Sequence, residues 1–196
     1  YSPAGLFGIV EEQGSIESLS VRGIVSVSDS ADTTTGGIVG INHGTLINCQ
    51  FTGVVTGDSE VGGIVGRNES EGTIDHSTAR AIVTGKSSTG GIAGYNLGAI
   101  TGCTNVGSIN TEYQEASLDT DGFTAKMVDQ INNKMAAADD DATNSVTNVA
   151  TDTGGIAGRS SGMILTSVNT GTVGYEHVGS VSYTHLRAHE TAANLV

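Results

Sequence analysis

The sequence predicts an all-β protein, a right-handed parallel β-solenoid of about five coils with one helical insertion. Three observations lead to this fold class. A glycine-rich stretch recurs along the chain, each copy contains short segments rich in β-branched residues, and equivalent positions in successive copies hold similar side chains. A repeat period of about 20–50 residues is typical of solenoids, propellers and other arrays.

Each copy of the repeat is anchored on a glycine that precedes Ile, or Leu in the first copy. The anchors lie 32, 26, 28 and 64 residues apart, at Gly5, Gly37, Gly63, Gly91 and Gly155. Three segments in each unit carry strand signals: the Gly-Ile-Val-Gly run, a segment after a second glycine, and a segment that ends in Val or Ile. Short β-branched runs bounded by glycine are typical of strands, so we predict three strands in each unit.

Two apolar columns are expected inside the solenoid. The first column holds Leu6, Ile38, Ile64, Ile92 and Ile156, and the second holds Val25, Val55, Val83, Ile109 and Val173. The position before the second column is mixed, with Ile24, Val54, Ile82, Ser108 and Thr172. Because side chains alternate faces along a strand, we place this mixed column outside. A propeller is the alternative, but its blades need four strands and about 40 residues each.

Asn42, Asn68 and Asn96 fall at equivalent positions, which we assign to turns. Two interpretations are open. The amides could hydrogen-bond to one another along the solenoid, or asparagine could be present because it tolerates the left-handed backbone of a turn. Neither interpretation implies a ligand.

The two cysteines, Cys49 and Cys103, share one column but lie two coils apart. At about 4.8 Å per coil they are separated by roughly 9.6 Å, beyond the Cα range of about 4.4–6.8 Å for a disulfide. We therefore predict two free, buried thiols.

The composition limits the classes of partner. The chain of 196 residues has a formal net charge of −13, 29 glycines and only 4% aromatic residues. Nucleic acids and anionic membranes attract clusters of Lys and Arg, so we expect no nucleic-acid partner and no membrane insertion. No segment approaches the ~20 apolar residues of a membrane span. An acidic surface rich in Ser, Thr, Asn and Gly suits an extracellular or cell-surface protein.

The repeats resemble the GLUG motif, which is named for its Gly-Leu-any-Gly core. Gly5-Leu6-Phe7-Gly8 fits that core, and the Gly-Gly-Ile-Val/Ala-Gly copies are close variants. The resemblance covers roughly residues 4–111 and 152–179. It implies a repeat region of a large bacterial secreted or surface-anchored protein, in which this piece is a stalk or adhesion module. Such repeats also occur in non-catalytic regions of immunoglobulin A-cleaving metallopeptidases. No active-site residue of that family maps onto this chain.

An insertion interrupts the repeat between residues 112 and 153. The solenoid domain, residues 1–179, includes it at about 112–150. Phe123, Met127, Val128, Ile131 and Met135 lie at helical spacing, which predicts a helix near Thr124–Ala138 packed on the side of the solenoid. The helix could bind a partner or cover apolar surface, and we favour the second. Asp119-Thr120-Asp121-Gly122 resembles part of a calcium loop, but Val128 stands where a bidentate Glu is needed.

The C-terminal residues 180–196 resemble a translated sequencing adapter. Val181-Ser182-Tyr183-Thr184-His185-Leu186-Arg187-Ala188-His189-Glu190-Thr191 carries that resemblance, and Ser180 ends the repeat abruptly. His189-Glu190 begins like a zinc-protease motif, but Ala193 stands where the second His belongs. We therefore expect a non-native tail, Ser180–Val196, and assign it no chemistry.

The remaining candidates for chemistry do not form a site. His43 and His76 fall in different columns, whereas zinc needs three or four converging ligands. A carboxylate pair could hydrolyse glycans, but nothing in the sequence fixes such a pair or raises a pKa. A solvated rim is the favoured interpretation of these acids: Asp58, Glu60, Glu69, Glu71 and Asp75. We predict no catalytic, cofactor-binding or metal-binding residue, and no cofactor.

Three functions remain. The leading one is a non-catalytic stalk or adhesion scaffold of a larger secreted or cell-surface protein. Its partner would be a host or cell-surface glycan or protein, and the solenoid would continue in the full-length chain. The second is a non-catalytic region of a secreted immunoglobulin A-cleaving-type metallopeptidase, and the third is a carbohydrate-active β-helix.

Overall fold

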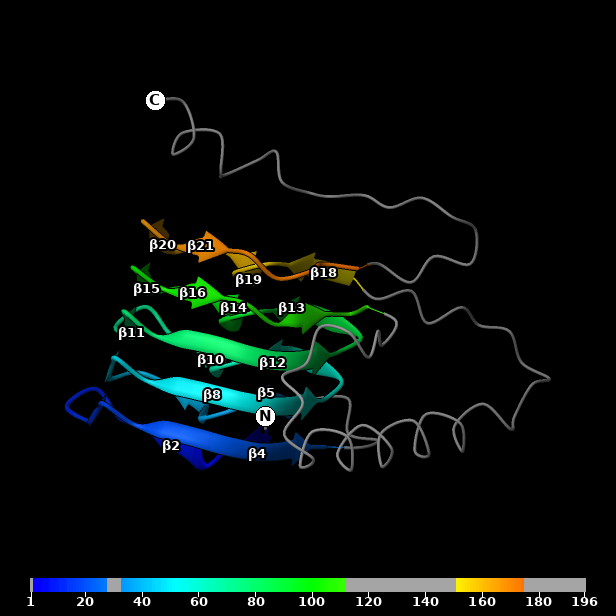
Figure 1. Ribbon diagram of the computed structural model, residues 1–196. Helices are drawn as coiled ribbons and strands as arrows, with labels where there is room; N and C mark the ends of the chain where they lie inside the picture. The colour runs from blue at the N-terminus through cyan, green and yellow to red at the C-terminus, as the bar shows by residue number, and fades with distance from the viewer. Residues whose placement is uncertain (1, 28–32, 112–150, 175–196) are drawn as a thin grey trace, which may run out of the picture.

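The computed structural model describes residues 2–27, 33–111 and 151–174. These residues form 21 strands and no helix, and every pair of adjoining strands is parallel. The layers stack from the blue N-terminal end to the orange C-terminal end in Figure 1. The described chain is therefore an all-β parallel solenoid, as the sequence predicts.

Four sheets run along the solenoid, and each receives one strand from every turn of the chain, except that one turn gives two short strands to the fourth sheet. Sheet A consists of β1 (Ser2–Ala4), β5 (Thr33–Gly36), β9 (Ser59–Gly62), β13 (Ser87–Gly90) and β18 (Thr151–Gly154). Sheet B consists of β2 (Phe7–Val10), β6 (Val39–Asn42), β10 (Val65–Asn68), β14 (Ala93–Asn96) and β19 (Ala157–Ser160).

The other two sheets follow in the same order along each turn. Sheet C consists of β3 (Ser15–Glu17), β7 (Thr45–Ile47), β11 (Thr73–Asp75), β15 (Ala99–Thr101) and β20 (Met163–Leu165). Sheet D consists of β4 (Ser20–Ser26), β8 (Gln50–Thr56), β12 (Thr78–Thr84), β16 (Thr104–Asn105), β17 (Ser108–Ile109) and β21 (Val168–Asn169).

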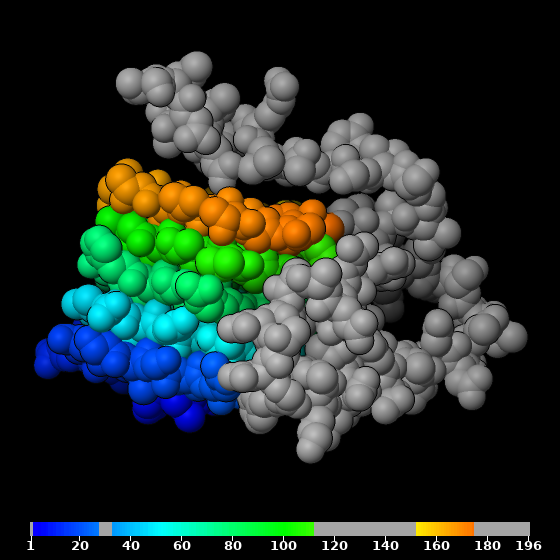
Figure 2. All heavy atoms as spheres, in the orientation of Figure 1, coloured from blue at the N-terminus to red at the C-terminus, as the bar shows by residue number. Residues whose placement is uncertain are grey.

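A coil contains one strand from each sheet, apart from coil 4, which has both β16 and β17 in sheet D. Coil 1 spans residues 2–26, coil 2 spans 33–56, coil 3 spans 59–84, coil 4 spans 87–109 and coil 5 spans 151–173. Figure 2 shows the coils as flat layers of atoms that lie directly on one another. Residues 112–150 separate coils 4 and 5 in sequence, yet Ile100 and Ile164 pair in register.

Each coil contributes strands to four sheets, and the prediction of three strands in each unit was wrong. The Gly-Ile-Val-Gly run is not one strand, because β5 ends at Gly36, the chain bends at Gly37 and Ile38, and β6 begins at Val39. A Cβ atom on Gly36 would collide with the carbonyl oxygen of Val39, so this corner requires glycine. The missed strands belong to sheet A, where short Thr- and Ser-rich segments lack the apolar runs used to find the others.

The two predicted inner columns are confirmed. Ile38, Ile64 and Ile92 are fully buried, and so are Val55, Val83 and Ile109. Leu6 continues the first column into coil 1, where 56% of its surface is exposed because no described layer lies beyond it. The apolar side chains are thus buried by neighbouring coils, as expected for a solenoid.

The mixed column lies outside the core cluster, as expected, but one member is buried. Ile24 is 40% exposed, whereas Val54 is buried although it does not belong to the core cluster. Val54 lies between Ile24 and Ile82 on the adjoining strands of sheet D. The predicted helix near residues 124–138 and the tail, residues 180–196, lie outside the described residues.

Candidate functional surface

A ladder of amides runs through the interior at the end of sheet B. Nδ2 of Asn42 donates to Oδ1 of Asn68 at 2.8 Å, Nδ2 of Asn68 donates to Oδ1 of Asn96 at 2.8 Å, and Nδ2 of Asn96 donates to Oγ of Ser160 at 3.1 Å. The three asparagines are fully buried and are absent from the described residues with positive φ. The ladder interpretation is therefore confirmed, and the left-handed-turn interpretation was wrong.

Each ladder amide also holds the turn that follows it. Nδ2 of Asn42 donates to the carbonyl oxygen of Gly44 at 3.1 Å, and its Oδ1 accepts from the backbone N–H of Gly44 at 3.2 Å. One side chain thus closes its own turn and bonds to the next coil. Because Asn42, Asn68 and Asn96 are fully buried, loss of a hydrogen bond between them would leave a buried polar group unpaired and lower stability.

Sequence reasoning missed a second amide ladder in sheet D. Nδ2 of Asn105 donates to Oδ1 of Asn169 at 2.7 Å, and both side chains bond to a glycine two residues on, Gly107 and Gly171. The signal was present, because Asn-x-Gly recurs at these positions as it does at Asn42. It was overlooked because the same column holds Val21, Phe51 and Ala79 in the first three coils.

The second glycine of each Gly-Gly-Ile copy makes room for this column. A Cβ on Gly37 would lie 2.6 Å from the ring of Phe51, and one on Gly155 would lie 2.5 Å from Cγ of Asn169. The solenoid is so thin here that a side chain of sheet D fills the space opposite each glycine. The spacing of the motif therefore follows from packing across the interior.

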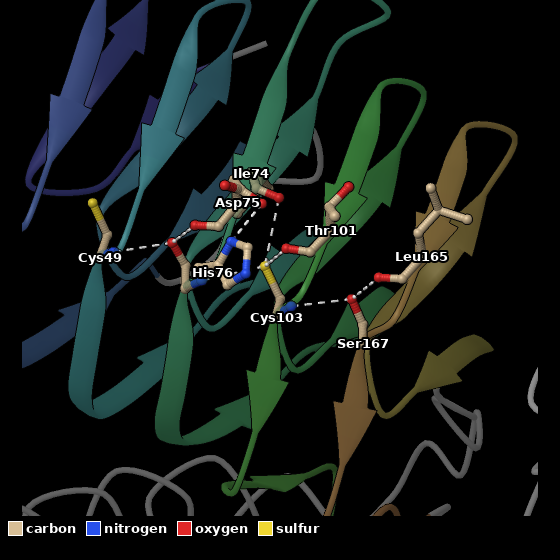
Figure 3. Close-up of polar contacts among 9 residues, drawn as sticks. Cys49, Ile74, Asp75, His76, Thr101, Cys103, Leu165 and Ser167 are labelled. Atoms are coloured by element: carbon tan, nitrogen blue, oxygen red, sulfur yellow. Dashed lines mark hydrogen bonds and ion pairs between the residues drawn. The ribbon is translucent and has the colours of Figure 1, made fainter. Parts of the chain in front are cut away.

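The two cysteines are free and buried, as predicted, and they alternate with serines in one column. The backbone N–H of Cys49 donates to Oγ of Ser77 at 3.0 Å, that of Ser77 donates to Sγ of Cys103 at 3.4 Å, and that of Cys103 donates to Oγ of Ser167 at 3.2 Å (Figure 3). Burial raises the pKa of the Cys103 thiol to about 11 and also raises the pKa of Cys49. The Cys103 thiol thus accepts a hydrogen bond from Ser77, and both thiols donate to backbone carbonyl oxygens, Cys49 to Ile16 and Cys103 to Ile74.

His76 lies on the outside, at the corner between sheets C and D. Its Nδ1 is 2.8 Å from Oδ1 of Asp75, its side chain is 69% exposed, and its ring covers Gly102 of the next coil. His43 belongs to the other end of sheet C, in the turn after Asn42. Within residues 2–27, 33–111 and 151–174 no group of three His, Cys, Asp or Glu side chains could hold a metal ion.

The acidic residues do not all form a solvated rim. Glu60 is 9% exposed, and its Oε1 is 2.6 Å from Nη1 of Arg67, which also bonds through Nε to Oε1 of Glu69 at 2.6 Å. Burial raises the pKa of Glu60, against the opposing effect of the Arg67 charge. The rim assignment was wrong for Glu60, which has a positive φ of 48° and is buried against its arginine partner.

Asp58 and Glu71 are closer than Glu60 to the predicted solvated rim. Oδ1 of Asp58 is 2.7 Å from Nζ of Lys86, which links coils 3 and 4. A hydrogen bond from Ser70 lowers the pKa of Glu71, whose side chain is exposed. Neither acid faces a second carboxylate across an open site in the described residues.

The outer face of sheet B carries a column that we call the arginine–tyrosine column: Arg67, Tyr95 and Arg159, paired in register. The Cζ atom of Arg67 is 4.8 Å from the centroid of the Tyr95 ring, and that of Arg159 is 5.7 Å from it. Both distances allow a cation–π interaction. Arg159 is exposed and forms no ion pair with a described carboxylate.

Comparison with protein families gives a match to the GLUG motif at residues 57–84. These residues comprise coil 3 and the two residues that precede it. The chain carries the GLUG motif. The register extends its glycines, its inner isoleucine and its ladder position through coils 2, 4 and 5, so the solenoid is built of GLUG-type coils.

A search of curated proteins finds a similar segment in halomucin from Haloquadratum walsbyi (strain DSM 16790 / HBSQ001). The identity is 36% over 75 residues, which cover 38% of this chain and 1% of that protein. No solved structure matches the chain. Among the described residues no helix is long and apolar enough to cross a membrane.

The GLUG coils thus direct their buried polar groups toward one another. The ladder amides and the cysteine–serine column bond to adjoining coils or to their own turns, and the described residues contain no convergent set of acids or nucleophiles. The arginine–tyrosine column lies on the outer face of sheet B, where the Arg159 side chain is exposed.

Proposed function

We propose that this chain is a non-catalytic repeat module of a larger secreted or cell-surface protein, where it acts as a stalk or an adhesion scaffold. The observation that carries the proposal is the continuity of the side-chain ladders from coil to coil. A structure held by nearest-neighbour layers can extend by whole coils and presents a long, repetitive surface.

Two further observations support an extracellular module. The halomucin segment that resembles this chain is a very small part of that protein, which fits a unit within a long polypeptide. The net charge of −13 and the polar outer face favour a soluble surface that repels nucleic acid and anionic lipid.

The arginine–tyrosine column is the surface that we assign to adhesion. Arginine and tyrosine are enriched where proteins contact partners, and Arg159 is free to pair with an anionic group on a glycan or protein. The test presents the full chain on beads to an array of host and cell-surface glycans and proteins. We expect retention that Arg159→Ala lowers at least about threefold, with Arg80→Ala as the matched control, since Arg80 is an exposed arginine on sheet D.

Equal retention of the Arg159 and Arg80 variants would remove the column from the proposal. No retention of the unmodified chain on any surface would remove adhesion and leave the stalk. The open reading frame of the parent protein decides between a surface protein and the metallopeptidase alternative, which requires a downstream His-Glu-x-x-His.

One observation keeps glycan hydrolysis as a second candidate, namely the raised pKa of Glu60. A general acid must reach its substrate, however, and the Glu60 side chain is only 11% exposed and pairs with Arg67. We expect no hydrolysis of polysaccharides by the purified chain. Activity that disappears in Glu60→Gln would reverse this conclusion.

A further inference from the structure

The two ends of the solenoid carry different chemistry at the same three columns. The columns are the sheet B amide ladder, the cysteine–serine column and the sheet D amide ladder. Coil 1 fills them with apolar side chains, Val10, Leu19 and Val21. Coil 5 fills them with polar side chains, Ser160, Ser167 and Asn169.

Each ladder also has a direction. Nδ2 of one coil donates to the side-chain oxygen of the following coil, from Asn42 to Asn68 to Asn96 and from Asn105 to Asn169. The backbone N–H groups of the cysteine–serine column point the same way. An added coil therefore accepts hydrogen bonds when it lies beyond coil 5 and donates them when it lies before coil 1.

Because each coil donates to the following one, Asn169 is the last donor of the sheet D ladder in the described residues. Nδ2 of Asn68 donates to both Gly72 and Asn96, and that of Asn105 donates to both Gly107 and Asn169. Nδ2 of Asn169 donates to Gly171 alone among the described residues. Its second N–H therefore has no acceptor among the described residues.

We propose that the end face of coil 5, made of β18, β19, β20 and β21, is an interaction surface for a further coil of the Asn-x-Gly type. That coil would present an amide oxygen over Asn169 and an amide or hydroxyl over Ser160. The face of coil 1 fits the opposite kind of coil, with apolar side chains at these columns, because Val10 and Val21 cannot accept a hydrogen bond.

A second copy of this chain does not meet that requirement. Its coil 1 would bring Val10, Leu19 and Val21 against Ser160, Ser167 and Asn169, which would bury an unpaired amide donor. The inference rests on coil stacking alone and does not depend on the adhesion role of the proposed function.

The test adds one coil to the full chain at either end. Residues 85–110, which contain the ladder positions Asn96 and Asn105, are duplicated between Gly174 and Tyr175 or placed ahead of Tyr1. Each extended chain is also made with Asn96→Val and Asn105→Val in the added copy only. Valine already occupies both columns in coil 1, so it fits them sterically.

Hydrogen exchange of the adjoining coil is the measurement. We call the added coil with its asparagines the Asn copy, and the one with both valine substitutions the Val copy. After coil 5, we expect the Asn copy to slow exchange of β19 and β21 roughly tenfold more than the Val copy does. Ahead of coil 1, the Val copy should protect β2 and β4 better than the Asn copy. The side-chain amide of Asn169, followed by NMR, should exchange more slowly only with the Asn copy after coil 5.

Equal protection by the Asn and Val copies at both ends would overturn the proposal, as would a preference for the same copy at both ends. Concentration-dependent growth of the unmodified chain into head-to-tail oligomers would also contradict it. Loss of bead adhesion affects none of these outcomes, so the two proposals fail separately.

Discussion

At the scale of single residues, Cys103 shows how one side chain joins adjacent layers. Its Sγ accepts from the backbone N–H of Ser77, while its own N–H donates to Ser167. Serine takes the same role at positions 77 and 167, so the column needs an acceptor of this size and does not need sulfur.

The raised pKa of Cys103 makes stability depend on alkaline pH. Its folded-state value is about 11 against 9.0 for the ordinary thiol, so between these values the folded protein holds more protons than the unfolded chain. The free energy of unfolding then falls as pH rises from 9 to 11, by about 2–3 kcal/mol from this group. Cys103→Ser keeps an acceptor and should flatten the decline, measured by urea unfolding at pH 8 to 11.

Cys49→Ser is the companion variant, because burial raises the pKa of that thiol too. The double variant should flatten the decline further. An unchanged slope in Cys103→Ser would show that the thiol ionises in the folded state as readily as in the unfolded chain.

At the scale of the strands, sheet A differs from the other sheets. The buried side-chain atoms without a hydrogen-bond partner in the described residues all belong to it: Thr34 Oγ1, Thr35 Oγ1, Glu60 Oε2 and Thr89 Oγ1. Sheet A also contains the left-handed residues Glu60, Ser88 and Asp152, which interrupt its regular pairing. Sheet A therefore combines unpaired buried polar groups with irregular strand pairing.

Two threonine variants of sheet A should change stability in opposite directions. Thr89 Oγ1 is buried without a partner, and Val61 holds the same position one coil earlier. Thr89→Val should therefore raise the free energy of unfolding by about 0.5–1 kcal/mol. Thr153 accepts from Nδ2 of Asn110 at 2.9 Å, so Thr153→Val should lower it by about 1 kcal/mol. Denaturant midpoints of the two variants give the comparison, and losses of similar size in both would contradict it.

The strands also show which features the sequence can reveal. Ile38, Ile64 and Ile92 repeat with one side-chain type at one spacing, so their shared column could be predicted without coordinates. The strands of sheet A could not be found in this way, because Thr33–Gly36 and Ser59–Gly62 share no apolar pattern. Asn105 and Asn169 escaped notice because their column changes from apolar to polar along the chain. Glu60 was misplaced because burial at a corner depends on the backbone conformation there.

At the scale of the whole molecule, stability should be greatest in the middle of the stack. Coils 2, 3 and 4 have described neighbours on both sides, and their inner isoleucines are fully buried. Phe7 of coil 1 is 41% exposed, although Val39, Val65 and Ala93 at the same position in coils 2, 3 and 4 are fully buried. Native-state hydrogen exchange should therefore be slowest in β6, β10 and β14, and faster in β2 and β19, by at least about tenfold.

Uniform exchange across all five coils would instead show that the stack opens in a single cooperative step. The matched comparison is within sheet B, where these strands are all four residues long and differ in their layer. Strand length and sheet identity are then held constant.

The pairing of Ile100 with Ile164 across the intervening residues 112–150 has a consequence for how such genes can change. The register between two layers is set by strand pairing and does not depend on how many residues separate them in the sequence. Deletion of coil 3 as a complete unit would bring Asn42 opposite Asn96 and keep amide facing amide in the sheet B ladder, whereas the loss of half a unit would change the register of the later strands. Recombination among the repeats therefore has to preserve whole units. Extra residues between two coils, in contrast, leave the pairing of the layers intact.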